Sequence, residues 1–266
     1  MSAVGRSGVI AICVFAFMTL FPQNPRRDAM LEGVPSGKTR VVDLTYAISD
    51  KLVPWPGDEK FFKAKVNATI EKNGYFTRSF WMLEHYGTHM DAPAHFPPGK
   101  ITVDQIPAKK LMGPAVVLDV RAESAKDADY QVPAGFVEAW EKKHGQIPEG
   151  AIVLLRTGWS SRWPDVKRYR NQDAQGKMHF PGFLTEAAKL LIERKVSGLG
   201  CDTLSIDFGA SGDFAVHHLT LGTGLYHLEN LADLSELPET GAFLIVAPIK
   251  LEGGSGGPVR VFALLP

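Results

Sequence analysis

Hydrophobic residues recur along this chain at two spacings, one typical of strands and the other typical of helices. Short apolar or alternating runs predict strands at 39–48, 114–120, 150–158, 198–207, 241–250 and 258–265. The run at 150–158 is almost continuously apolar, as expected when both faces of a strand are buried. Helical spacing predicts helices at 134–145 (ending at Gly145), at 184–198 (with Thr185 as the N-cap) and at 228–237.

Two further β-rich runs, 61–70 and 75–84, flank the turn-forming sequence EKNG and predict a β-hairpin. Together with the other runs they indicate an α/β protein with more antiparallel character early in the chain than a doubly wound sheet has. The chain of 266 residues is long enough for one large domain. No second boundary is visible, so we expect a single domain over 39–266, preceded by a leader and linker over 1–38.

The N-terminus carries an apolar run from Val9 to Phe21, preceded by Arg6. The run is shorter than the roughly 20 residues of a membrane span and resembles the hydrophobic region of a signal peptide. No A-x-A cleavage pattern follows it, so an uncleaved membrane anchor is the alternative. We expect an exported protein, periplasmic or secreted, or a cytoplasmic one if the run is not a functional signal.

Charge and cysteine content narrow the classes of partner. Lys+Arg and Asp+Glu both number 29, so the formal net charge is zero and there is no basic surface to favour nucleic acid or anionic membrane. The chain has two cysteines, and Cys13 lies in the leader, so Cys201 has no partner for an intramolecular disulfide. A small-molecule substrate is therefore the expected partner.

Candidate metal ligands are most concentrated in the segment MLEHYGTHMDAPAHFPPG, residues 82–99. Four candidate ligands fall within eleven residues: His85, His89, Asp91 and His95. A fully extended strand would spread them over roughly 33 Å, too far to share one metal ion. Gly87 and Pro93 supply bends, so we expect a strand end and a folded loop that gathers these side chains.

Imidazoles with one carboxylate suit zinc, manganese or iron better than calcium or magnesium, which prefer oxygen ligands. His85, His89 and Asp91 would leave positions open for water, whose pKa a metal lowers to about 7. His95 is either a fourth ligand or the base that moves the proton. A second cluster could complete a mononuclear or binuclear site: His217, His218, His227 and Glu229.

The sequence GGSGG at 253–257 satisfies the G-x-S-x-G pattern of a serine hydrolase, with Ser255 as the nucleophile. That pattern requires a strand, a turn and then a helix. Here Pro258 and a predicted strand follow, and no acid or histidine comes after Ser255. We therefore expect a flexible loop near the pocket rather than a nucleophile.

The segment HYGTHMDAPAHF resembles the HxGTHxDxPxH signature of the cyclase / bacterial kynurenine formamidase family, which also contains isatin hydrolases. The similarity extends over about 40–266 through PWPGD, LLRTGW and DTLSID. The closing EGGSGGPVRVFALL is most like the isatin-hydrolase side of the family. The resemblance implies a swivelling β/β/α-type fold, with a mixed sheet and flanking helices, and a metal-dependent hydrolase of amides.

The resemblance also implies roles for individual residues. The ligands of a first divalent ion, zinc or manganese, would be His85, His89 and Asp91. In binuclear members Asp91 bridges to a second ion, which His217 and Glu229 would hold here, so that one or two ions bind per subunit. His95 would be the catalytic histidine, and Trp55 in PWPGD would line the substrate pocket.

These implications lead to a prediction of function. We expect metal-activated water to cleave the amide C–N bond of an aromatic N-acyl amine or cyclic amide, as in arylformamidases (kynurenine formamidases) of tryptophan catabolism. His95 would take the proton of the water and pass it to the leaving nitrogen. An isatin hydrolase-like lactam or lactone hydrolase is the alternative, and a non-catalytic metal- or ligand-binding protein on the same fold is the second. The resemblance further implies a homodimer or a higher homo-oligomer.

Overall fold

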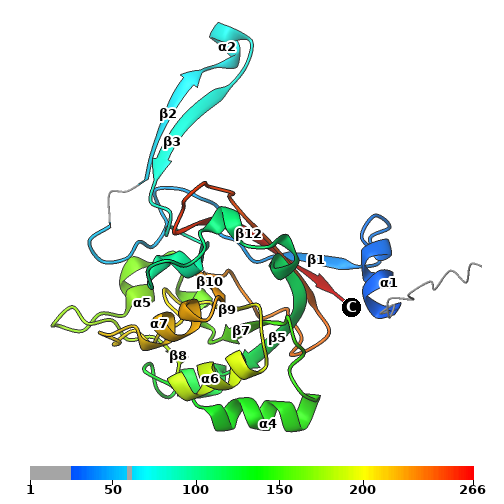
Figure 1. Ribbon diagram of the computed structural model, residues 1–266. Helices are drawn as coiled ribbons and strands as arrows, with labels where there is room; N and C mark the ends of the chain where they lie inside the picture. The colour runs from blue at the N-terminus through cyan, green and yellow to red at the C-terminus, as the bar shows by residue number, and fades with distance from the viewer. Residues whose placement is uncertain (1–24, 59–61) are drawn as a thin grey trace, which may run out of the picture.

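The computed structural model describes residues 25–58 and 62–266, and a sheet that closes on itself forms its centre (Figure 1). The sheet has eight strands in the order β1 (Arg40–Asp43), β12 (Gly256–Leu265), β11 (Phe243–Pro248), β5 (Met112–Asp119), β7 (Ile152–Arg156), β9 (Gly198–Cys201), β10 (Tyr226–Glu229) and β4 (His89–Asp91). Because β4 also pairs with β12, all of them except β1 form a closed barrel. Strands β5, β7, β9 and β10 run parallel and the other pairs antiparallel, which confirms the predicted mixed sheet.

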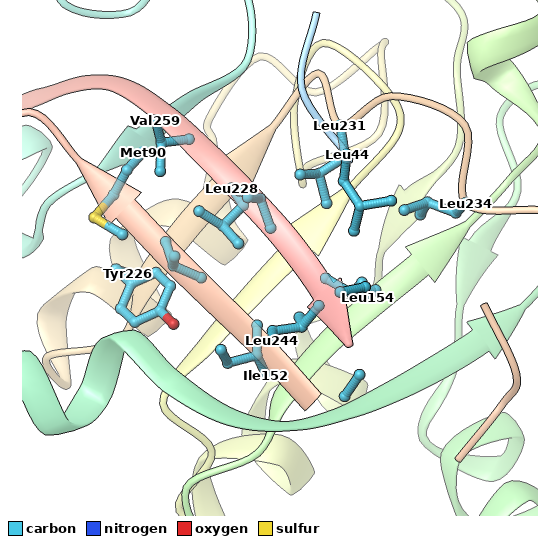
Figure 2. Packing of buried hydrophobic residues seen from close by; sticks show 14 of the residues in the cluster. Leu44, Met90, Ile152, Leu154, Tyr226, Leu228, Leu231, Leu234, Leu244 and Val259 are labelled. Carbon is cyan, nitrogen blue, oxygen red and sulfur yellow. The ribbon is translucent and has the colours of Figure 1, made fainter. Parts of the chain in front are cut away.

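Alternate residues of each strand fill the barrel. Leu154 of β7, Leu228 of β10 and Leu244 of β11 belong to one buried cluster, and Figure 2 shows them packed together. The intervening residues Val153 and Leu155 belong to a second cluster outside the barrel. The strand predicted from the continuous apolar run is therefore buried on both faces, because side chains alternate between the two sides of a strand.

Helices α4 (Ala134–His144), α6 (Thr185–Glu193) and α7 (Ala215–Gly222) cover the outer face of the parallel strands and supply the other half of the second cluster. Shorter elements connect them: α3 (Arg121–Ser124), α5 (Val166–Arg170) and the paired strands β6 (Gln131–Val132) and β8 (Gly182–Phe183). Three 3-10 helices precede β5 (Pro93–His95, Val103–Gln105 and Ala108–Leu111), and a fourth follows β7 (Trp159–Arg162).

The predicted hairpin is present as β2 (Phe62–Ala68) and β3 (Thr77–Met82), joined through the single helical turn α2 (Ile70–Asn73). It extends away from the barrel as an arm (Figure 1). The arm carries large apolar side chains that are exposed on this chain: Val66, Ile70, Tyr75, Phe76 and Phe80.

Two predictions of local structure are wrong. No helix spans 228–237: Leu228 and Glu229 end strand β10, and irregular backbone follows. The apolar spacing there suits a helix, but pairing of β10 with β4 and β9 decides the conformation. At α6 the N-cap position is Leu184, and Thr185 is the first helical residue, whose hydroxyl contacts Glu186. Helix α4, by contrast, ends before Gly145 as predicted.

The segment before the barrel is more structured than a linker, because it includes helix α1 (Pro25–Gly33). The apolar run from Val9 to Phe21 lies outside the described residues, so export stays a prediction. Among the residues that are described, no helix is both long and apolar enough to cross a membrane.

Candidate metal centre

The antiparallel pair of β4 and β10 brings two distant parts of the chain together at the outer face of the barrel. Asp91 lies opposite His227, and His89 lies opposite Glu229, while Leu228 stands between them opposite Met90. Met90 and Leu228 point into the barrel core. Side chains alternate along a strand, so the other four, all buried, share the opposite face.

The segment before β4 turns back on itself and places His85 beside this face. Gly87 adopts φ +70°, a left-handed conformation that favours glycine, and β4 begins two residues later. His85 Nδ1 thereby lies 2.6 Å from Asp91 Oδ1. With the 3-10 turn at Pro93–His95, this confirms the bends predicted at Gly87 and Pro93.

Hydrogen bonds orient both histidines that face the two carboxylates. His89 Nδ1 lies 2.9 Å from the Gly87 carbonyl and can donate to it, so Nε2 faces Asp91 Oδ1 at 3.3 Å and Glu229 Oε2 at 3.5 Å. His217, on helix α7, has its Nδ1 2.6 Å from Asp207 Oδ2. Its Nε2 then lies 3.3 Å from both Asp91 Oδ2 and Glu229 Oε1. Metal-binding imidazoles are commonly oriented in this way by a partner on the second ring nitrogen.

His227, one of the four candidates in the second cluster of the sequence, also points at this site, although the family resemblance gave it no role. Its Nε2 lies 2.7 Å from Thr220 Oγ1, and its Nδ1 lies 3.4 Å from Asp91 Oδ2. Among the described residues, neither His227 Nδ1 nor Asp91 Oδ2 has a hydrogen-bond partner, although both atoms are buried. The signal was present, because His227 is two residues before Glu229 and shares its strand face, but the segment was assigned to the start of a helix.

The charges of this cluster are strongly coupled. Burial alone would raise the pKa of the Asp91 carboxyl, but contacts with the neighbouring imidazoles, above all that of His217, hold it well below its usual range. Burial opposes ionisation of His89, yet Asp91 and Glu229 raise its pKa to about 9. The buried carboxylate oxygens therefore lie close enough to the ring nitrogens for one or more cations to bind between them.

The donor types fit a divalent metal. Two groups have ligand atoms within 4.8 Å of one another: His85, His89 and Asp91, and Asp91, His217, His227 and Glu229. Imidazole nitrogens combined with carboxylate oxygens are typical of zinc, manganese or iron sites. The predicted ligands are thus brought together, and Asp91 is the residue common to both groups.

His95 lies beside the cluster but belongs to neither ligand group. Its ring stacks on that of His85, with centroids 3.8 Å apart. Burial, reinforced by the neighbouring imidazoles, lowers the pKa of His95 to about 4, so the ring is neutral at pH 7 and able to accept a proton. This placement is compatible with a proton carrier, and the catalytic role of His95 stays a prediction.

A cavity of about 620 Å³ opens onto the cluster. His85, His89, His95, His217 and Glu229 line its polar end. Trp55, Phe96 and Phe214 give it an aromatic wall, with the Phe214 ring centroid 6.0 Å from that of Trp55 and 5.5 Å from that of Phe96. Trp55 therefore lies in the pocket, as the resemblance implies, and the volume is in the range of small-molecule sites.

The glycine-rich tail also reaches this pocket. Ser255 Oγ donates to Glu84 Oε2 at 2.7 Å and lies 2.9 Å from His85 Nε2, which can donate to it. Gly256 is required next to it, because a Cβ there would meet the Met90 carbonyl at 2.3 Å. Ser255, His85 and Asp91 thus form a chain of contacts like that of a serine triad, but the Ser255 proton points to Glu84 and strand β12 follows instead of a helix.

Two supporting residues, Glu84 and Asp207, were not anticipated. Both are carboxylates that bond to the residues around the cluster rather than to its centre. Asp207 ends the run 198–207, which the sequence predicts as a buried strand and its exit turn, so its proximity to His217 depends on where helix α7 packs. Sequence spacing alone contains no signal for either contact.

Comparison with known proteins gives a consistent result. The family model named Cyclase matches residues 42–208. An isatin hydrolase from Roseibium aggregatum is 35% identical over 247 residues, covering 87% of this chain and 94% of that protein. A kynurenine formamidase from Salinibacter ruber is 29% identical over 225 residues, covering 83% and 95%. The crystal structure of an isatin hydrolase bound to the product analogue thioisatinate has a TM-score of 0.83 at 32% identity, covering 91% of this chain and 98% of the other.

Proposed function

The chain belongs to the cyclase family of metal-dependent hydrolases, and we propose that it hydrolyses the ring amide of a small aromatic lactam of the isatin type. The observation that carries this proposal is the aromatic pocket lined by His85 and His89, two of the three residues in the first ligand group. Similarity is higher to the isatin hydrolase, at 35% identity, than to the kynurenine formamidase, at 29%. It therefore supports the lactam alternative over the formamidase activity that we predicted first.

The residues that line the pocket support a ring-containing substrate. Trp55, Phe96 and Phe214 can contact an aromatic ring, and the candidate metal ligands line the same cavity. An aromatic lactam has the same division, with an apolar ring on one side and an amide carbonyl on the other. Bound in this way, its scissile carbonyl would face His85 and His89.

The proposed reaction adds water across the C–N bond. When bound, a divalent ion supplies Lewis acidity and lowers the pKa of water. His85, His89 and Asp91 would hold that ion, and the neutral imidazole of His95 would accept the proton that the water loses. His95 then returns this proton to the leaving nitrogen, so that the carbonyl carbon gains oxygen, the C–N bond breaks and the ring opens to an amine and a carboxylic acid, which releases its proton to solvent as it ionises.

The test uses the purified full-length protein. We expect hydrolysis of isatin faster than that of N-formylkynurenine, abolition by EDTA and restoration by zinc or manganese. Faster turnover of N-formylkynurenine would return the assignment to a formamidase. Hydrolysis that resists complete metal removal would contradict the mechanism, and metal binding without hydrolysis of either substrate would favour the non-catalytic alternative.

We also propose that the chain forms a homodimer or a higher homo-oligomer through the β2–β3 arm. Tyr75, Phe76 and Phe80 are more than half exposed there, which is unusual for large apolar side chains gathered on one element. The arm ends at Met82, which lines the pocket together with Leu83. Light scattering should show an assembly larger than one chain, and Phe80→Asp should shift it toward the monomer. A monomeric wild-type protein would contradict this proposal.

A further inference from the structure

The two oxygens of Asp91 face different sets of imidazoles. Oδ1 lies 2.6 Å from His85 Nδ1 and 3.3 Å from His89 Nε2. Oδ2 lies 3.3 Å from His217 Nε2 and 3.4 Å from His227 Nδ1. The carboxylate thus separates the cluster into two halves, and His227 lies in the same half as His217 but, unlike His217, does not line the pocket.

Hydrogen bonding determines which nitrogen of His227 carries the proton. The single hydroxyl proton of Thr220 is donated to the Val216 carbonyl, at 2.7 Å within helix α7. Thr220 Oγ1 can therefore only accept from His227 Nε2, which lies 2.7 Å away. The neutral ring then presents a lone pair at Nδ1 to an anionic oxygen at 3.4 Å, and neither atom has a hydrogen bond among the residues that the structure describes.

Two buried acceptors that face each other are costly unless a cation lies between them. We propose that His227 is a metal ligand and completes a second site in which all four ligands come from the protein. These ligands are Asp91, His217, His227 and Glu229. The family resemblance implies only His217 and Glu229 with the shared Asp91, and this inference rests on the proposed metal-dependent hydrolase.

Ligation by His227 would give the second ion a role different from that of the first ion. Four protein ligands fill the tetrahedral positions of a zinc ion and close the site, whereas three leave a position open for water. His85, His89 and Asp91 would hold the first ion with a position left open, and His85 and His89 line the pocket. The second ion would hold Asp91, Glu229 and helix α7 in place while the first serves catalysis.

The experiment counts zinc ions per chain in the full-length protein, after removal of metal with a chelator and dialysis against zinc. We expect two ions in the wild type and one in His227→Leu. The matched control is His218→Leu, because His218 is a neighbouring but exposed histidine and its loss should leave two ions. Thr220→Val removes only the hydroxyl that orients His227, and the second ion should then bind about 10–100-fold more weakly.

The outcomes separate the two proposals. One ion in the wild type, or two ions of unchanged affinity in both His227→Leu and Thr220→Val, would overturn the role of His227 and leave the hydrolase proposal intact. A wild-type protein that binds no zinc or manganese would refute the proposed function itself. Thermal melting in chelator identifies any variant that fails to fold, and Thr220→Val then decides the question.

Discussion

Asp91 and Asp202 are both almost completely buried, at 1% and 0% exposure, but their surroundings differ. Asp202 accepts hydrogen bonds from the backbone N–H groups of Thr157 and Gly158, both at 2.9 Å, and from the Thr157 hydroxyl at 2.7 Å. Asp91 receives no backbone hydrogen bond and faces imidazoles, and its Oδ2 has no hydrogen-bond partner within the described structure.

The difference separates a structural carboxylate from one prepared for a ligand. Backbone donors stabilise Asp202 as part of the fold, where it joins the loop after β7 to the end of β9. Asp91 has comparable burial without those donors, so the native chain retains an unsatisfied acceptor. Such an arrangement persists where the rest of the structure enforces it, and this happens most often at functional sites.

The largest effect is expected for Asp91→Asn. The change removes the charge shared by both ligand groups, so bound metal should be lost and kcat/KM should fall roughly 10³-fold or more, since metal catalysis contributes several kcal/mol. In the presence of chelator the free energy of unfolding should not fall, because one unsatisfied anion disappears. Metal analysis, kinetics and urea unfolding check these points. Full metal content with normal activity would contradict the difference in role between Asp91 and Asp202.

His95→Ala should leave the metal in place and lower kcat by about 10²–10⁴-fold, the usual contribution of general acid–base catalysis. The reason is that His95 stacks on His85 without joining either ligand group. Metal content and kcat are measured on the same sample. Equal loss of metal content and kcat would show that His95 is a metal ligand and belongs to the cluster around Asp91.

Ser255→Ala should reduce kcat/KM by about tenfold, in line with loss of a residue that orients a metal ligand. Ser255 accepts from His85 and donates to Glu84, so its removal leaves His85 less well oriented. A loss of activity to background with metal retained would instead identify Ser255 as a nucleophile. The kinetics therefore also test whether the Ser255–His85–Asp91 contacts act as a triad.

The smallest effect on activity, and a clear effect on stability, is expected for Asp202→Asn. The amide replaces one accepting oxygen, leaving a donor of Thr157 or Gly158 unpaired, and the free energy of unfolding should fall by about 1–3 kcal/mol. Activity per folded molecule should change little. If Asp202→Asn lost activity while Asp91→Asn lost only stability, the assignment of roles would be reversed.

Much of the first ligand group could be predicted because it is local. His85, His89 and Asp91 lie within seven residues, and the bend that gathers them is encoded by Gly87 and Pro93 in the same segment. The almost continuous apolar run at 150–158 likewise predicted strand β7, since a strand buried on both faces needs apolar residues at successive positions. These features depend on neighbours in sequence and so are visible there.

The second ligand group could not be resolved in the same way. His217, His218 and His227 are equally available as residue types, but only two of them face Asp91. His227 turns inward because β10 pairs with β4, and His217 because helix α7 packs on the barrel. The incorrect helix at 228–237 arose from the same limit, since its apolar spacing does not reveal the strand partner.

The amino-acid sequence by itself determined the chemistry available to this protein: imidazoles and carboxylates of a divalent-metal hydrolase, a bend that gathers the first three ligands, and aromatic residues for a pocket. Only the tertiary structure decided that Asp91 lies between two groups of ligands and that His227, rather than His218, belongs to one of them. The physical reason is that hydrogen bonding between β4 and β10, which are far apart in the chain, sets which side chains share a face.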